Sequence, residues 1–389
     1  MKKVFLTISI ILVLTQSAWA ANFEQDRYVQ DLVARISHET LNSEYDKAIF
    51  RTQDLINRYP REPFPRFLLT TIYMYILRSY GEFPADEKYE IYKRKFLIAA
   101  ADAEKACDEY PVQNATIYFL RGMVLGAEGM VYLQDKEWLD SYSKGKRAVA
   151  ALEKSLEIDP TNYDAYLGLG MFEYYCSKLT GAIKILAWLV GFSGNSEKGI
   201  EYATKAMTQG KYSEGPAKVF LTYAYIQFEN KLDEGVELAR DLRSRYPRNF
   251  SFIDHILRAA RKLPPERAAD GLKWIDTYVK TPNWKEEVIL FVPFNLEEVD
   301  YVQASLYLAR NDYAAARNLL EPVSACSNHI DEFSTEVNLA LLYVYAKTAN
   351  HDKAKEIYSL IINNKPINNS HSKAKGLKTL VPDLPLPQG

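Results

Sequence analysis

Cysteine is scarce in this sequence, with three residues in a chain of 389. Cys107, Cys176 and Cys326 lie far apart, and so few cannot form the framework of disulfide bonds that stabilises small secreted domains. Cys107 and Cys176 fall in helical patterns among apolar neighbours. We therefore expect both to pack as small buried hydrophobic residues, with a single structural bridge as the alternative.

Residue patterns for catalysis and for cofactor binding are also absent. The five histidines are isolated, and none has a second histidine at the spacing of zinc ligands. The sequence has no Gly-Lys-Ser/Thr phosphate loop and no Gly-x-Ser-x-Gly elbow. Gly168 and Gly170 lack the third glycine of a dinucleotide site. We expect a non-enzymatic protein without cofactor or metal; the alternative is an envelope hydrolase with an unrecognised site.

Neither sign of charge is in excess. The chain has 48 basic and 50 acidic residues, a formal net charge of −2. A nucleic-acid partner normally requires a strongly basic surface. This balance therefore disfavours nucleic acid as a partner.

An apolar run stands at the N-terminal end of the sequence. Lys2 and Lys3 precede an apolar run over residues 4–14, and Ala18-Trp19-Ala20 has the small residues that a signal peptidase requires. The run is too short to cross a bilayer. We predict a cleaved secretory signal over residues 1–20, rather than a retained anchor. The short Lys-Lys start is typical of bacterial signals, so the expected location is the periplasm.

What the sequence does contain is a repeated interval between a small residue and a proline. The interval is twelve residues long, and it separates Ala48 from Pro60, Ala99 from Pro111, Ala148 from Pro160, Gly235 from Pro247 and Ala354 from Pro366. A small residue lets two helices approach closely, and proline ends a helix because it lacks a backbone donor. The pattern predicts a series of helix pairs.

The stretch over residues 148–170 resembles the tetratricopeptide repeat, whose pattern places an aromatic before Leu-Gly and a proline after the second helix. Tyr166, Leu169 and Gly170 follow Asp159-Pro160 in that order. The resemblance implies an all-α fold, a right-handed superhelical solenoid of about eight antiparallel helix pairs, over residues 21–366. Residues 367–389 are polar and proline-rich, so we expect a disordered tail.

Units two, three and four of this series are longer than the standard repeat. Their small residues are 29, 26 and 29 residues apart (Thr70–Ala99, Gly122–Ala148 and Gly170–Gly199), against twelve for Ala304 and Ala316. We predict lengthened hairpins in these units, with aromatic side chains that either pack the longer helices or form a shared functional edge. The most apolar insert, residues 179–192, is expected to pack on a neighbouring repeat; membrane contact is the alternative.

Residues 165–260 resemble a second group, the inclusion-body-clearance family of tetratricopeptide proteins. The similarity lies in Gly191-Phe192-Ser193-Gly194-Asn195 followed by Gly199-Ile200. Asn195 stands where the family often has Asp, and Ile200 where it has Leu. That family acts in eukaryotic compartments that a secreted bacterial-type chain does not share. The resemblance therefore implies architecture and not task.

In tetratricopeptide proteins, certain positions of each first helix face a concave groove. Carried over to this chain, the resemblance implies a ligand-binding groove that includes Leu167, Met171, Tyr174, Tyr175, Phe220, Gln227, Tyr301 and Tyr343. Aromatic anchors suit an extended peptide or a partner helix. We expect a protein-interaction scaffold of the cell envelope. The alternatives are rings that merely fill the interior, and a lipid- or membrane-associated adaptor that uses residues 179–192. The partner's identity and the oligomeric state stay open.

Overall fold

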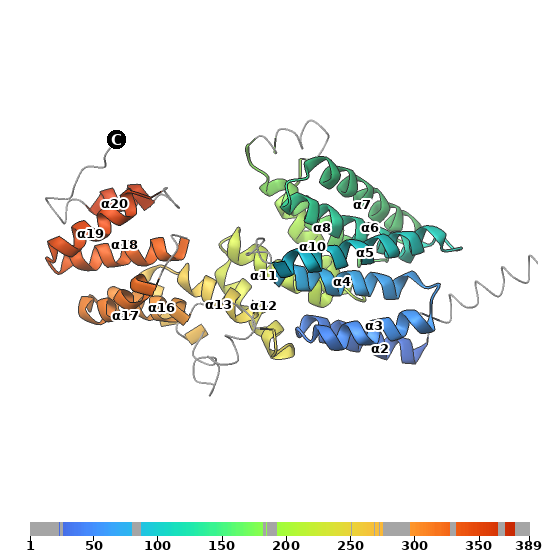
Figure 1. Cartoon of the computed structure of the whole chain (residues 1–389), viewed down its shortest axis with the longest axis horizontal. Coiled ribbons are helices and arrows are strands. Elements are labelled where there is room, and N and C mark those ends of the chain that lie inside the picture. Colours follow the sequence, from blue (N-terminus) through green and yellow to red (C-terminus); the bar gives the residue numbers. More distant parts are fainter. Residues whose placement is uncertain are drawn as a thin grey trace, which may run out of the picture. The chain divides into compact units, whose positions relative to one another are not determined.

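The computed structural model of the chain is helical over the residues it describes, which are 23, 26–79, 87–181, 184, 193–249, 251–267, 269–271, 273, 274, 296–326, 332–364 and 370–377. Among these residues there is no β-strand, so the all-α prediction is confirmed. The predicted signal at residues 1–20 lies outside the described residues. Figure 1 shows the helices.

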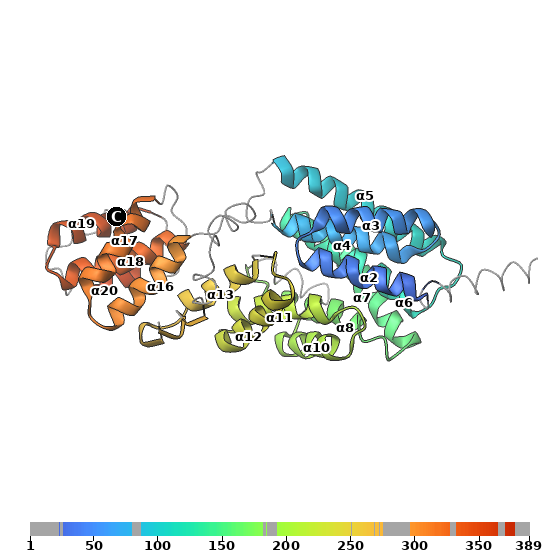
Figure 2. The ribbon, with the colours of Figure 1, turned by 90° about the horizontal axis from the view of Figure 1, so that it is seen from below.

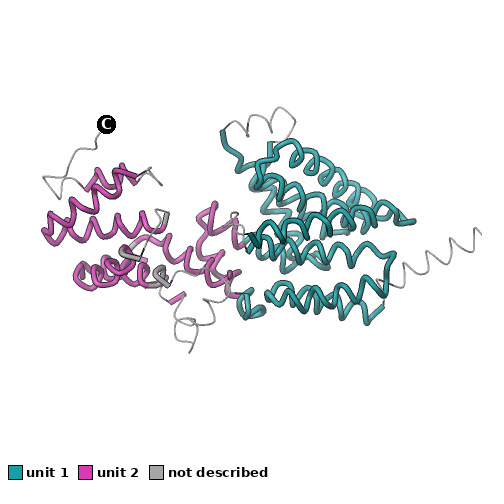
Figure 3. Tube along the Cα trace, viewed as in Figure 1, with its two compact units in different colours: residues 1–221, 241–249 teal, residues 222–240, 250–389 magenta. Residues whose placement is uncertain are grey.

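The chain divides into two compact units (Figure 3), of which unit 1 is formed by Met1–Leu221 and Asp241–Asn249. Unit 2 is formed by Thr222–Arg240 and Phe250–Gly389. The helices that begin in unit 1 are α2 (Arg27–Leu41), α3 (Tyr45–Arg58), α4 (Pro63–Ser79), α5 (Glu87–Glu109), α6 (Ala115–Gln134), α7 (Trp138–Ile158), α8 (Ala165–Lys178), α10 (Ser196–Gln209) and α11 (Glu214–Gln227). Those that begin in unit 2 are α12 (Leu232–Arg245), α13 (Ser251–Arg261), the 3₁₀ helix η1 (Pro265–Arg267), α16 (Leu296–Ala309), α17 (Tyr313–Cys326), α18 (Glu332–Lys347), α19 (His351–Ile362) and α20 (Ser370–Gly376).

Successive helices fold back on each other and form the predicted pairs. In unit 1, α2 packs on α3, α4 on α5, α6 on α7 and α8 on α10; in unit 2, α16 packs on α17 and α18 on α19. The first helices of neighbouring pairs in unit 1 also lie side by side, because α4 contacts both α2 and α6, and α6 contacts α8 (Figure 2). This arrangement gives unit 1 an inner wall built from first helices.

One turn geometry recurs between the two helices of a pair. Ser43, Lys136, Asn230, Asn311 and Ala349 each follow a first helix with a positive φ, between 52° and 64°. After four of them, the next backbone N–H donates to the carbonyl five residues earlier, as in the bond from Glu44 to Glu39 of 2.8 Å. This pattern is the Schellman C-cap, which pairs carbonyls that the end of a helix leaves open.

Small residues allow the paired helices of unit 1 to approach closely, as the sequence predicted. A Cβ on Gly170 would lie 2.8 Å from the carbonyl oxygen of Gly199, and one on Gly199 would lie 2.8 Å from that of Gly170. A Cβ on Gly122 would lie 2.6 Å from Leu152 Cγ and 3.1 Å from the Ala148 carbonyl. Backbone contacts this short leave no room for a side chain at Gly170 or Gly199, and a side chain at Gly122 would require Leu152 to shift.

The lengthened hairpins take two forms. In units two and three the helices themselves are long, since α5 has 23 residues, α6 has 20 and α7 has 21. In unit four, α8 and α10 keep 14 residues each, so the extra chain lies between them. Most of residues 179–192 lies outside the described residues, as does the segment 80–86.

The segment expected to be a disordered tail differs from that expectation at α20. Ser370 is 1% exposed and Ala374 is fully buried, and Ala374 packs with the core of α18 and α19. One small buried face is enough to dock a short helix on neighbouring helices. The polar composition of the segment concealed this face, because α20 offers only one buried apolar residue.

Candidate ligand cavity

Unit 1 closes on itself through contacts between its first hairpin and a segment more than 200 residues later. The Arg248 backbone N–H donates to Asn42 Oδ1 at 2.8 Å, and Asn249 Nδ2 donates to the Leu41 carbonyl at 2.8 Å. The rings of His38 and Tyr246 lie 5.3 Å apart beside these bonds. At the other end of the same wall, Phe64 and Tyr212 lie 5.1 Å apart. These contacts join the beginning and the end of unit 1.

The helices of unit 1 surround a cavity of about 1170 Å³. Its wall comes chiefly from α2, α4, α6, α7, α8 and the start of α11. The lining is predominantly apolar, with leucine, valine, phenylalanine, methionine, alanine and glycine. Trp138 and Leu139 line the cavity and are 41% and 84% exposed, so they lie at its rim. The volume is somewhat larger than the roughly 300–1,000 Å³ that is typical of ligand pockets.

Four of the eight predicted groove residues line this cavity, namely Leu167, Met171, Tyr175 and Phe220. Tyr174 is fully buried behind them, with its ring edge-on to Tyr175 at 5.9 Å and to Phe220 at 5.3 Å. This ring supports the wall, in line with the alternative that some rings only fill the interior.

The other three predicted residues belong to unit 2 and are not among the residues that line the cavity. Gln227 Oε1 accepts a hydrogen bond from Lys262 Nζ at 3.2 Å. Tyr301 packs edge-on to Phe333 at 5.8 Å, and Tyr343 packs edge-on to Tyr313 at 6.2 Å. Five of the eight residues thus lie in unit 1 and three in unit 2. The role of any of them in ligand binding stays a prediction.

Sequence reasoning missed the contribution of the first three units. Their lining residues include Val33, Phe67, Met74, Tyr75, Phe119, Met123 and Met130. The available signal was the set of repeat positions that selected Leu167 and Met171 by resemblance, applied to α2, α4 and α6. Of the insert aromatics, Tyr89 and Phe96 are 1% and 0% exposed and pack the longer helices, whereas Tyr142 lines the cavity.

Four of the hydroxyl groups in the wall donate to backbone carbonyls. Thr40 donates to the Ile36 carbonyl at 2.7 Å, and Thr70 and Thr71 donate to carbonyls of their own helix at 3.0 Å. Ser141 donates to the Gly129 carbonyl at 2.9 Å. These donors are used within or between helices.

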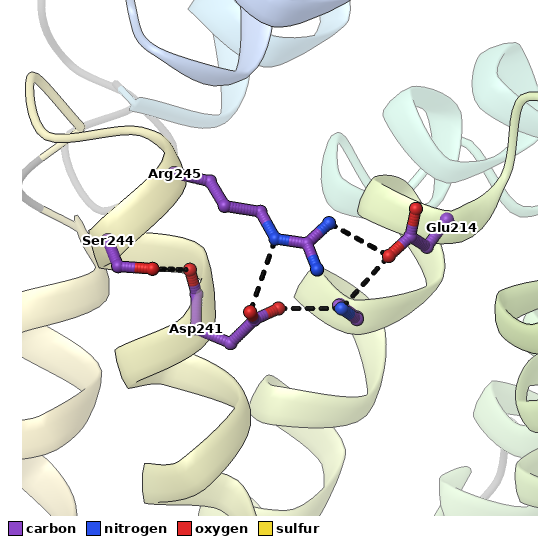
Figure 4. A network of polar contacts seen from close by, with 5 residues as sticks. Glu214, Asp241, Ser244 and Arg245 are labelled. Atoms are coloured by element: carbon purple, nitrogen blue, oxygen red, sulfur yellow. Dashed lines mark hydrogen bonds and ion pairs between the residues drawn. The ribbon is translucent and has the colours of Figure 1, made fainter.

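Three residues with charged side chains line the cavity: Arg78, Lys211 and Glu214. Glu214 belongs to a network with two cations and a second carboxylate (Figure 4), and its Oε1 lies 2.8 Å from Arg245 Nη1 and 3.0 Å from Lys218 Nζ. Lys218 also pairs with Asp241 at 2.6 Å. Hydrogen bonds from Lys218 and then Arg245 lower the pKa of Glu214. This network is internally neutral.

Arg78 differs from the other two, because it has no ion pair or hydrogen bond with any described residue. It is exposed at the end of α4, one turn after Tyr75. Burial raises the pKa of Tyr75 to about 12, and the Arg78 charge acts against this rise. Tyr246, which also lines the cavity, is close enough to affect Tyr75 as well. Arg78 thus brings a positive charge to this polar corner and has no ion-pair partner among the described residues.

The remaining predicted features concern cysteines, metals and membranes. Cys107 and Cys176 are free; Cys107 is buried and Cys176 is half-buried in the cavity wall. Over the described ranges, no three of His, Cys, Asp and Glu are grouped as metal ligands. None of the helices that the structure describes is both long and apolar enough to span a bilayer.

No protein-family model matches the chain, and no curated protein matches it.

Proposed function

We propose that this chain is a non-enzymatic binding protein of the cell envelope, a tetratricopeptide-like superhelical solenoid that holds the apolar part of its ligand in the unit 1 cavity. The observation that carries the proposal is the cavity itself, about 1170 Å³ with a predominantly apolar wall and three charged residues. Apolar surface left in contact with water is costly, and filling it with an apolar ligand recovers that free energy. Secretion to the periplasm is part of the same proposal.

The repeated hairpin turn supports the tetratricopeptide-like part of the proposal. The same Schellman geometry occurs at Ser43, Lys136, Asn311 and Ala349, although these residues share no side-chain chemistry. The close contact of Gly170 with Gly199 supplies the small-residue packing that such repeats use.

The wall argues against one of the three expected ligands, an extended peptide. Each residue of an extended peptide brings an N–H and a C=O that need partners when they leave water. The wall is predominantly apolar, and four of its hydroxyl donors, those of Thr40, Thr70, Thr71 and Ser141, already donate to backbone carbonyls. A partner helix pairs its backbone N–H and C=O groups within itself, and an acyl chain has no such groups. We therefore retain two ligand classes for the cavity. One is a partner helix, as in the scaffold hypothesis, and the other is a lipid, which we now assign to the cavity and not to residues 179–192.

A neutral apolar dye tests the proposal. Nile red should bind the wild-type protein with enhanced fluorescence. Gly126→Phe should abolish this binding, because a Cβ at Gly126 meets only Ala148 Cβ at 3.8 Å and leaves the added ring free to fill the cavity. Ile98→Phe is the control, since Ile98 is 65% exposed and does not line the cavity. Equal dye binding by Gly126→Phe and wild type would reject the cavity as the site.

A further inference from the structure

The cavity wall has the composition of a surface that adapts to its ligand. Four of the six methionines of the chain line it: Met74, Met123, Met130 and Met171. Methionine is unbranched and has three rotatable bonds, so it conforms to irregular apolar shapes. Gly126 and Gly168 line the same wall without side chains. A wall of this kind suits a flexible chain of methylene groups.

The contacts that close unit 1 on itself favour an alkyl chain over a partner helix as the ligand. An amphipathic helix needs a groove that is open along its length, so that its polar face stays in water. Here the bonds of Asn42 with Arg248 and of Asn249 with Leu41 connect the two ends of the wall. A helix placed inside would bury polar side chains against apolar ones, which is costly. An alkyl chain has no polar face to bury.

Charge gives the ligand a direction. The Glu214 network balances two cations with two carboxylates, and the Lys211 ammonium lies 4.8 Å from the centre of the Tyr212 ring. Arg78 has no such partner among the described residues. A guanidinium pairs with carboxylate and phosphate oxygens through two parallel N–H bonds. One end of the cavity is therefore prepared for an anionic group.

We propose that the ligand is a single-chain anionic amphiphile, with its alkyl chain in the unit 1 cavity and its headgroup beside Arg78. The inference rests on the proposed function, because it names the ligand class of the same cavity. A fatty acid and a single-chain phospholipid share this chemistry. Their headgroups, carboxylate and phosphate, distinguish them.

Calorimetric titration of the full mature chain with twelve-carbon amphiphiles tests the headgroup. Dodecanoate and dodecyl phosphate, each below its micellar concentration at pH 8, should bind at least tenfold more tightly than 1-dodecanol and dodecyltrimethylammonium. The tighter of the two anions identifies the headgroup. Arg78→Gln should bring both anions to the affinity of dodecanol and leave dodecanol unchanged. Arg94→Gln, at an exposed arginine outside the cavity, should change nothing.

Chain length tests the alkyl site independently. Burying one methylene contributes about 0.8 kcal/mol, which corresponds to roughly fourfold in affinity. Affinity should therefore rise about fourfold per added methylene from octanoate to dodecanoate, and Gly126→Phe should flatten this slope. A flat slope in the wild-type protein overturns the inference.

Two further outcomes also overturn it and are distinct from failure of the proposed function. If dodecanoate, dodecanol and dodecyltrimethylammonium bind equally, and Arg78→Gln has no effect, the site is apolar but not selective for anions. If an amphipathic helical peptide displaces Nile red from the wild-type protein and dodecanoate does not, the ligand is a partner helix. In both cases the dye test still supports the proposed function, which fails only when Nile red ignores the cavity.

Discussion

Two glycines of unit 1, Gly170 and Gly126, should differ in how replacement by alanine changes the stability of the protein. At Gly170 a Cβ would lie 2.8 Å from the Gly199 carbonyl oxygen and 2.9 Å from the Ala203 nitrogen, and backbone atoms cannot move aside. We expect Gly170→Ala to destabilise the protein by about 1–3 kcal/mol. Gly126→Ala should be neutral or stabilise by up to about 1 kcal/mol, because its Cβ meets nothing closer than 3.8 Å and alanine favours helix. Chemical denaturation of both variants measures this, and equal effects would contradict the close helix contact.

The buried thiol of Cys107 gives a pH-dependent stability. Burial raises the pKa of Cys107 from its ordinary value of 9.0 to about 12. The folded state therefore favours the neutral thiol. The stabilisation that the neutral thiol contributes is fully present below pH 9. It is lost as the pH rises toward 12, and each unit of the pKa shift corresponds to about 1.4 kcal/mol. The stability advantage of the wild type over Cys107→Ala should shrink between pH 9 and pH 11 in urea titrations. A constant difference would show that the thiol does not titrate differently on folding.

At the scale of helices, the Schellman turn predicts that replacing lysine by glycine has opposite effects on stability at two positions. Lys136 has a φ of 64°, where a side chain is strained, whereas Lys146 lies exposed inside α7. Lys136→Gly should stabilise the protein by about 1 kcal/mol, because glycine adopts positive φ without penalty. Lys146→Gly should destabilise it by about 1 kcal/mol through lost helix propensity. Thermal denaturation checks both, and loss of stability at Lys136 would mean that its side chain has a further role.

Helices were predictable because their signals are local. The small residue and the proline twelve positions later lie in the same helix and the turn after it, as for Ala148 and Pro160. It was harder to predict which residue of each turn adopts the positive φ. Asn311 has the positive φ in its turn, but in the last pair Ala349 has it and Asn350 instead caps α19 through the Lys353 N–H. Asn311 and Asn350 look equivalent in sequence, and they occupy successive positions of one motif.

At the scale of the molecule, the candidate site was only half predictable. The expected groove positions on α8 and α11 came from the resemblance to the tetratricopeptide repeat, and of these Leu167, Met171, Tyr175 and Phe220 line the cavity. Closure did not follow, because Asn42 and Arg248 are 206 residues apart and no local pattern connects them. The division into two units is equally non-local, since it cuts α11 after Leu221. Contacts of this range depend on the summed rotation of several hairpins.

Closure of unit 1 leads to a prediction for Asn249. Asn249→Ala removes the donor to the Leu41 carbonyl and leaves a buried acceptor unpaired, which costs about 1–3 kcal/mol. Asn162→Ala, in the same unit, removes a comparable hydrogen bond to Ser155 Oγ at 2.8 Å and serves as the matched control. Both variants should lose stability. Only Asn249→Ala should also speed hydrogen exchange in α2 and weaken Nile red binding, because it frees one wall of the cavity from the segment that holds it. If α2 exchanges at the wild-type rate in Asn249→Ala, the cavity does not depend on ring closure, and the argument against a partner helix loses its basis.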